Sequence, residues 1–101
     1  MNYVNIDDNR LKDLMKDKDN TILIDVRSEE EYEEKNIQDS INIPLNNLLY
    51  SIDDIEEYKD KNVIIYCRSG HRSITACNLL SMEGFNKIYN LEKGIIGYDF
   101  K

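Results

Sequence analysis

One short stretch of the chain combines a nucleophile with positive charge: VIIYCRSGHRS, residues 63–73. Apolar residues suited to a buried strand lead into Cys67, and two arginines, a histidine and a glycine follow within five positions. The whole chain carries a formal net charge of −7, so these cations run against its overall balance. Cationic neighbours lower the pKa of a thiol and attract anions. The stretch therefore predicts a reactive cysteine in an anion-binding site.

The residues after Cys67 favour a loop whose backbone binds an anion. Gly70 supplies conformational freedom, so the N–H groups of the loop can turn inward as a nest. Arg68 and Arg72 add charge, and the N-terminus of a following helix adds the positive end of its dipole. The alternative is a buried structural cysteine beside a solvated basic loop. The cations that directly follow the cysteine make this alternative the weaker one.

Short apolar segments alternate with helical patterns along the chain. Strands are expected at residues 3–6, 21–26, 41–43, 62–66 and 87–90. Helices are expected after Asp7 or Asp8, after Ser28 and over residues 72–82, with one or two short helical turns within 45–58. The spacing of Ser28 and Glu31 is that of a capping box.

This alternation predicts an α/β fold with a central, mostly parallel five-stranded sheet flanked by helices. The 101 residues fit a single small domain, residues 1–101. Ligands bind beyond the carboxyl ends of the strands in such a sheet, and Cys67 follows directly after one of those ends.

Composition limits the partners and the compartment. Acidic residues outnumber basic ones by 20 to 13, which argues against a surface for nucleic acid or an anionic membrane. The first residues lack the apolar core of a signal peptide, and the longest apolar run, VIIYC, is too short to span a bilayer. We therefore expect a cytoplasmic protein with reduced thiols. No metal and no cofactor are expected, because the single histidine and two separated cysteines lack the spacing of a zinc site.

The stretch from Cys67 onward resembles the active-site loop of rhodanese-type sulfurtransferases, particularly the single-domain bacterial kind. The segment LIDVRSEEEYEEKNIQDSINIPL is similar to another block of that family, with Asp-Val-Arg after a strand and a glutamate four residues later. LEKGIIGY resembles the family's C-terminal segment, with Gly94 retained. The resemblance covers roughly residues 3–100, and its departures, at Lys35-Asn36, Asp39-Ser40 and Tyr98, lie outside the reactive loop.

The resemblance implies a rhodanese-like fold and a sulfurtransferase. Cys67 would be the nucleophile that takes sulfane sulfur from a small anionic donor, carries it as a persulfide, and passes it to a thiol or protein acceptor. The residues implied to bind substrate are Arg68, Ser69, Gly70, His71 and Arg72. Their backbone would cradle the persulfide, and Arg68 would orient the donor. Of the pair Arg68-Ser69, only Arg68 is typical of members that use thiosulfate, so the pair favours thiosulfate as the donor without specifying it.

Three other functions are possible for this fold. The chain could be a persulfide carrier or a rhodanese-like interaction module that acts with a protein partner. It could also be a Cdc25-like phosphatase. The phosphatase signature has five residues between cysteine and arginine, whereas four separate Cys67 from Arg72. One residue fewer gives a narrower ring, which suits a sulfur atom better than a phosphate.

Asp25 and Arg27 are expected at the carboxyl edge of the sheet, at the end of the second strand. The leading interpretation is an internal salt bridge, with Arg27 paired to Glu31, and support for the active-site loop is the alternative. His71 either donates a hydrogen bond to the substrate or faces solvent.

Two further features each have a structural and a functional interpretation. Cys77 is expected to pack in the core, with a role as resolving thiol as the alternative. The acidic run over residues 29–34 is expected to be a solvated helix face, with docking of a basic partner protein as the alternative.

Overall fold

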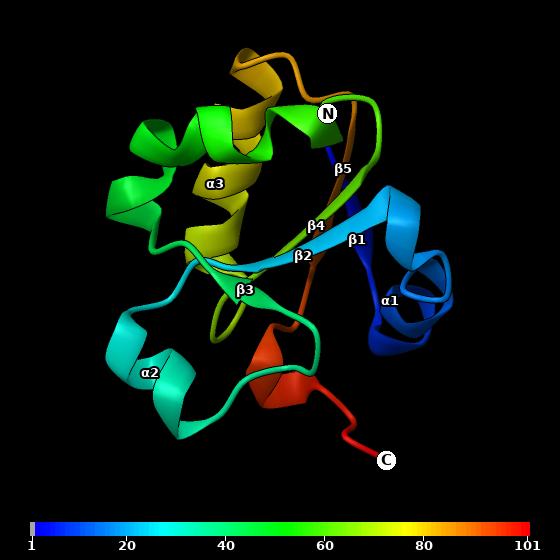
Figure 1. Cartoon of the computed structure of the whole chain (residues 1–101). Coiled ribbons are helices and arrows are strands. Elements are labelled where there is room, and N and C mark those ends of the chain that lie inside the picture. Colours follow the sequence, from blue (N-terminus) through cyan, green and yellow to red (C-terminus); the bar gives the residue numbers. More distant parts are fainter. Residues whose placement is uncertain (1) are drawn as a thin grey trace.

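The computed structural model describes residues 2–101 and contains the predicted sheet (Figure 1). Its strands are β1 (Val4–Ile6), β2 (Thr21–Asp25), β3 (Ile41–Asn42), β4 (Asn62–Tyr66) and β5 (Lys87–Leu91). They are hydrogen-bonded in the order β1-β5-β4-β2-β3, and all of these pairs are parallel. The prediction of a mostly parallel five-stranded sheet flanked by helices is therefore confirmed.

The central strands β2 and β4 are continuous apolar runs because the sheet is covered on both faces. All five residues of β2 are buried, as are the last four of β4. The register places Asp25, the last residue of β2, opposite Tyr66, the last residue of β4. The segments that follow both strands therefore leave the sheet side by side at its carboxyl edge.

The helical elements lie close to their predicted positions. They are α1 (Asp8–Leu14), α2 (Glu29–Glu34), α3 (His71–Met82) and the 3-10 segments η1 (Lys18–Asn20), η2 (Leu45–Tyr58) and η3 (Ile95–Gly97). The Asp7 side chain caps α1, and Ser28 with Glu31 forms the predicted capping box of α2. The expected short turns within residues 45–58 form one longer element, η2.

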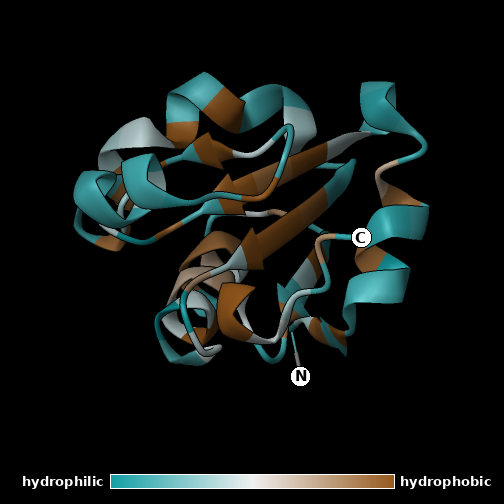
Figure 2. Ribbon diagram, turned by 90° about the horizontal axis from the view of Figure 1, so that it is seen from below, coloured by the Kyte–Doolittle hydropathy of each residue, from teal (hydrophilic) through white to brown (hydrophobic). Residues whose placement is uncertain are grey.

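Two apolar clusters cover the two faces of the sheet. On one face, α3 and η2 pack against the side chains of Ile24, Ile65 and their neighbours. On the other face, α1 packs against Leu23, Ile64 and Tyr66. Figure 1 shows α3 and α1 on opposite sides of the strands, and Figure 2 shows apolar strands between helices that are largely polar on the outside.

The buried hydroxyl group of Tyr66 fixes the connection between α2 and β3. It accepts a hydrogen bond from the backbone N–H of Ile37 at 3.1 Å and lies 3.2 Å from the Ser40 hydroxyl. A buried polar group needs such partners to offset its desolvation. Across residues 2–101, no helix combines the length and the apolar character needed to cross a bilayer.

Candidate active site

The Cys67 sulfur lies in a ring of hydrogen-bond donors at the end of β4. The backbone N–H groups of Gly70 and Ser73 donate to Cys67 Sγ, with N···S distances of 3.1 and 3.4 Å. The Ser73 Oγ atom is 3.4 Å from the sulfur, so its hydroxyl group can donate to the thiolate and accept from the neutral thiol. Cys67 is only 1% exposed, so the sulfur is recessed.

The start of α3 explains why these donors are free. The N-cap residue, Gly70, has no side chain to accept from the first turn of the helix. Ser73 is the third helical residue, whose N–H usually bonds to an N-cap side chain. The Cys67 sulfur accepts from this N–H instead. A negative charge on the sulfur is also favoured there by the helix dipole.

These contacts set the protonation of Cys67. Burial by itself raises the pKa of the thiol, because it disfavours the charged form. Hydrogen bonds from the Ser73 hydroxyl and from the backbone N–H groups of Ser73, Gly70 and Ser69 oppose burial, and the net effect is a lowered pKa. The direction agrees with the sequence prediction. Among the causes that the sequence suggested, the loop N–H groups are found to lower this pKa, and the Ser73 hydroxyl group acts with them.

Ser73 is the residue that sequence reasoning missed. It is the last residue of the stretch 63–73, but the sequence did not lead us to predict a contact between its side chain and the sulfur. The signal was its position: if a helix begins just after Gly70, the third helical residue presents its N–H and hydroxyl group to the residue that precedes the loop.

The C-terminal segment holds the cysteine loop in shape. The backbone N–H of Ile95 donates to the carbonyl of Cys67 at 2.9 Å, and that of Ile96 donates to the carbonyl of Arg68 at 3.1 Å. Gly94 has a φ of +63°, and a side chain there would collide with the backbone of Arg68. With these carbonyl groups bound on the tail, the loop N–H groups are left to face the sulfur.

Arg72 does not contact the sulfur. Its guanidinium group makes two hydrogen bonds to the Glu31 carboxylate, with N···O distances of 2.7 and 3.0 Å. The predicted salt bridge between Arg27 and Glu31 is therefore wrong. The capping box holds the Glu31 side chain at the start of α2, where it faces α3.

Arg27 pairs with Asp25 instead, two residues before it. The closest contact joins Arg27 Nη2 to Asp25 Oδ2 at 2.6 Å, and both side chains are buried. The same guanidinium group also donates to the carbonyl of Lys35 at 2.6 Å. An internal salt bridge is thus present at the carboxyl edge, with a different partner from the predicted one.

The remaining loop side chains lie at the surface. Arg68, Ser69 and His71 are exposed, and their side chains make no hydrogen bond to the sulfur among the residues described. Ser69 Oγ is 3.4 Å from His71 Nδ1. Of the two interpretations of His71, the one in which it faces solvent matches its exposure.

Cys77 packs in the core, as predicted. It is 0% exposed, and burial raises the pKa of its thiol to about 12. The acidic run on α2 is solvated at Glu29, Glu30, Glu33 and Glu34. Glu31 is the exception, because it binds Arg72.

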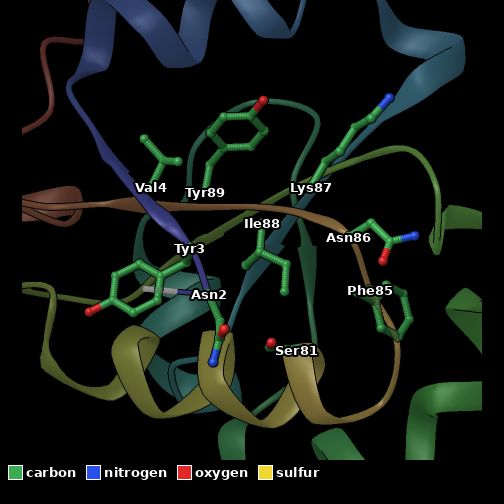
Figure 3. A pocket seen from close by; sticks show the side chains of 9 residues that line it. All are labelled: Asn2, Tyr3, Val4, Ser81, Phe85, Asn86, Lys87, Ile88 and Tyr89. Atoms are coloured by element: carbon green, nitrogen blue, oxygen red, sulfur yellow. The ribbon is translucent and has the colours of Figure 1, made fainter.

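Two hollows differ in their relation to Cys67. One, of about 570 Å³, lies beside the cysteine loop between α2 and the C-terminal tail, and its walls include Arg68, Ile96 and Phe100. The other, of about 470 Å³, is lined by the starts of β1 and β5 and by Ser81 near the end of α3 (Figure 3). Because Cys67 follows the carboxyl end of β4, this second hollow lies at the opposite edge of the sheet. Within residues 2–101, no group of three or more histidine, cysteine, aspartate or glutamate side chains could hold a metal ion.

Fold and loop together define a class of small α/β proteins that present a recessed, hydrogen-bonded cysteine at the carboxyl edge of a parallel sheet. The family description "Rhodanese-like domain" matches residues 7–99. The chain belongs to this family.

Known relatives agree with this assignment. The chain is 34% identical over 93 residues to a sulfurtransferase of Allochromatium vinosum, covering 92% of this chain and 85% of the relative. It is 36% identical over 67 residues to the thiosulfate sulfurtransferase PspE of Escherichia coli, covering 66% and 64%. A rhodanese-related protein from Thermoplasma volcanium has a similar structure, with a TM-score of 0.74, 31% identity and coverage of 98% and 96%. These similarities support sulfurtransferase activity in general.

The Ser73 hydroxyl provides a first prediction. Ser73→Ala keeps the backbone N–H but removes the hydroxyl hydrogen bond to the thiolate. The alkylation rate of Cys67 at neutral pH should fall about tenfold, as expected for a lost hydrogen bond to a charged group. Its pH midpoint should rise. Thr75→Ala, which removes an exposed hydroxyl from the same helix, is the control, and equal midpoints in the two variants would contradict the role of Ser73.

Two glycines with positive φ test the contact between tail and loop. Gly94→Ala forces a methyl group into the backbone of Arg68, whereas Gly84→Ala, at a φ of +93°, has no neighbour within 4 Å. Gly84→Ala should cost only backbone strain, about 1–2 kcal/mol in urea unfolding. Gly94→Ala should cost more and should also lower the reactivity of Cys67. Equal effects of the two substitutions on Cys67 alkylation would show that the tail does not shape the loop.

Proposed function

We propose that the protein, as one rhodanese-like domain, moves sulfane sulfur from a thiosulfate-like donor through a Cys67 persulfide to a thiophilic acceptor. The observation that carries this proposal is the convergence of the Gly70 and Ser73 N–H groups and the Ser73 hydroxyl on one recessed sulfur. Donors fixed in this way stabilise charge without reorganising during the reaction. The same donors would serve the anionic persulfide. Reduced thiols are required, which fits a cytoplasmic location.

In the loading step, the Cys67 thiolate attacks the outer sulfur of the donor. For thiosulfate, the new bond joins Cys67 Sγ to that sulfur. The bond within thiosulfate breaks, and its electron pair leaves on sulfite. In the second step an acceptor thiolate attacks the outer sulfur of the persulfide, and the electron pair of the broken bond returns to Cys67. The lowered pKa of Cys67 suits it to both roles, since a thiolate is the nucleophile and the better leaving group.

Arg68 is the loop cation suited to orient an anionic donor. Its side chain is exposed, lines the hollow beside the loop, and takes part in no salt bridge of residues 2–101. Arg72 is occupied by Glu31, so its guanidinium group is not available in the same way. We therefore keep thiosulfate as the leading donor and assign its orientation to Arg68.

A specific observation favours a protein or larger thiol as the acceptor. Ile96 and Phe100 are 67% and 47% exposed and lie in the wall of the hollow beside the loop. Cyanide needs no apolar contact, whereas an acceptor that covers these side chains would gain from burying them. This observation supports the second candidate, a persulfide carrier that passes sulfur to a protein partner.

Phosphatase activity is the least supported alternative. A phosphoryl group in transfer spreads its charge over three equatorial oxygens and needs room for them. The ring described above is closed tightly enough for two N–H groups to reach one sulfur atom. Donors this close to Cys67 Sγ would also lie near the outer sulfur of a persulfide, one bond further on.

Intact-mass analysis tests the sulfur carrier. Incubation with thiosulfate should add the mass of one sulfur atom, and cyanide or dithiothreitol should remove it. Cys67→Ser should abolish loading because no nucleophile remains, whereas Cys77→Ser should retain it because Cys77 lies in the core. Loading that persists in Cys67→Ser would refute the proposal.

Ring size separates the two enzymatic alternatives. The native protein should transfer sulfur from thiosulfate to cyanide and should hydrolyse aryl phosphates negligibly. Insertion of one residue between His71 and Arg72 should widen the ring and lower sulfur transfer. Robust Cys67-dependent phosphatase activity of the native protein, without persulfide formation, would instead identify a phosphatase.

A further inference from the structure

The ion pair between Glu31 and Arg72 joins two distant parts of the chain beside the reactive loop. Arg72 is the second residue of α3. It lies in the chain between Gly70 and Ser73, the two residues whose backbone N–H groups donate to the Cys67 sulfur. Its guanidinium group is turned onto Glu31 in a two-bond arrangement, Nη1 to Oε1 and Nη2 to Oε2. Such paired contacts fix the direction of an arginine as well as its charge.

Glu31 is itself held in place from its other side. Its Oε1 atom accepts from the backbone N–H of Ser28 at 3.1 Å and from the Ser28 hydroxyl at 3.2 Å. The first turn of α2 therefore presents a preset carboxylate to Arg72. The contact with Arg72 and the contacts with Ser28 lower the pKa of Glu31 to about 2, so the pair is fully charged at neutral pH.

Charged side chains at the carboxyl edge are partly paired, and the ones unpaired within residues 2–101 include Glu34 and Lys35, which line the hollow beside the loop. The two pairs are Asp25 with Arg27 and Glu31 with Arg72. The loop residues Arg68 and His71 are exposed and form no salt bridge within residues 2–101. The field of the Cys67 thiolate also reaches Arg72, whose raised pKa owes most to Glu31 and a smaller part to Cys67. Any change that frees Arg72 would thus be felt at the sulfur.

We propose that Glu31 is a positioning residue that sets the charge of the sulfur site by holding the Arg72 guanidinium group on itself and away from the sulfur. This inference rests on the proposed sulfur transfer through Cys67. The pair then acts as a nearly neutral unit, and the N–H ring and Arg68 are left to bind the anionic donor.

A free arginine at this place would have two costs for transfer. The intrinsic nucleophilicity of a thiolate falls as its pKa falls, so a second cation near Cys67 makes each thiolate less reactive. Sulfite, the anionic product of loading from thiosulfate, would also be retained by a free guanidinium group. Glu31 avoids both effects without removing the arginine that ties α2 to α3.

Glu31→Gln is the direct test because it removes one charge and little else. Glutamine also serves in a capping box, so the start of α2 keeps its hydrogen bonds. With Arg72 released, the pH midpoint of Cys67 alkylation should fall, and KM for thiosulfate should fall about two- to fivefold, the range expected for a partly exposed pair. The turnover number should fall as well, and sulfite should inhibit more strongly.

Two controls separate this role from a structural one. Glu30→Gln removes the same charge from the same helical turn, but Glu30 is exposed and its side chain forms no hydrogen bond or salt bridge within residues 2–101. It should leave the midpoint and KM close to those of the native protein. Arg72→Gln leaves the Glu31 carboxylate unpaired, so the midpoint and KM should both rise.

The double variant Glu31→Gln/Arg72→Gln decides between the two possible roles of Arg72. If the pair acts as a neutral unit, removing both charges should return the midpoint and KM to within about twofold of the native values. If Arg72 binds the donor directly, the double variant should keep the raised KM of Arg72→Gln, and the proposal is overturned. Values for Glu31→Gln that match those of Glu30→Gln would overturn it as well.

The alkylation series requires no sulfur transfer. If the native protein fails to form a persulfide while the alkylation midpoints shift as described, the proposed function fails and takes the predicted effects on KM with it, whereas the effect of Glu31 on the charge of Cys67 stands. If persulfide forms normally and the midpoints do not move, the role of Glu31 fails alone. Urea unfolding of each variant confirms that the compared proteins are folded.

Discussion

The donation of hydrogen bonds to the Cys67 sulfur is the interaction on which the rest of the site depends. Burial of a sulfur atom that must carry charge is unfavourable unless donors surround it. Strand β4 delivers the cysteine to the carboxyl edge, and the first turn of α3 supplies the N–H and hydroxyl groups of Ser73. The tail after β5 binds the loop carbonyl groups and keeps the N–H groups turned inward. Three separate segments thus cooperate to hold one atom.

Charge around this atom is arranged by pairing more than by accumulation. Arg27 and Arg72 each lie on a carboxylate, so two of the three arginines at this edge are compensated. Arg68 remains exposed for an anionic ligand. This arrangement reconciles a cationic loop with a strongly acidic chain: hydrogen-bond donors of the loop and of α3 surround the sulfur, and Arg68 is the exposed cation beside it. The short acidic helix α2 has a defined part in this scheme through Glu31.

Much of this architecture could be predicted from the sequence because it depends on local signals. The apolar run of β2, the capping box of α2 and the position of Cys67 after β4 each follow from a few adjacent residues. The partners of Arg27 and Glu31 could not be predicted. Glu31 binds Arg72 and not Arg27 because α2 faces α3, and Arg27 binds Asp25 instead. The hydrogen bonds from Ile95 and Ile96 to the loop join segments nearly thirty residues apart, and no local pattern specifies them. Ser73 lies between these cases: its position in the helix was predictable, but its contact with sulfur required the turn at Gly70.

The most direct test of the central claim is a crystal structure of the protein after treatment with thiosulfate. The account predicts one additional sulfur atom bonded to Cys67 Sγ at about 2.0–2.1 Å. That atom should lie inside the ring of loop N–H groups, with Arg72 still on Glu31. An unmodified Cys67, or an added sulfur that lies outside the ring and is contacted mainly by an arginine side chain, would contradict the account.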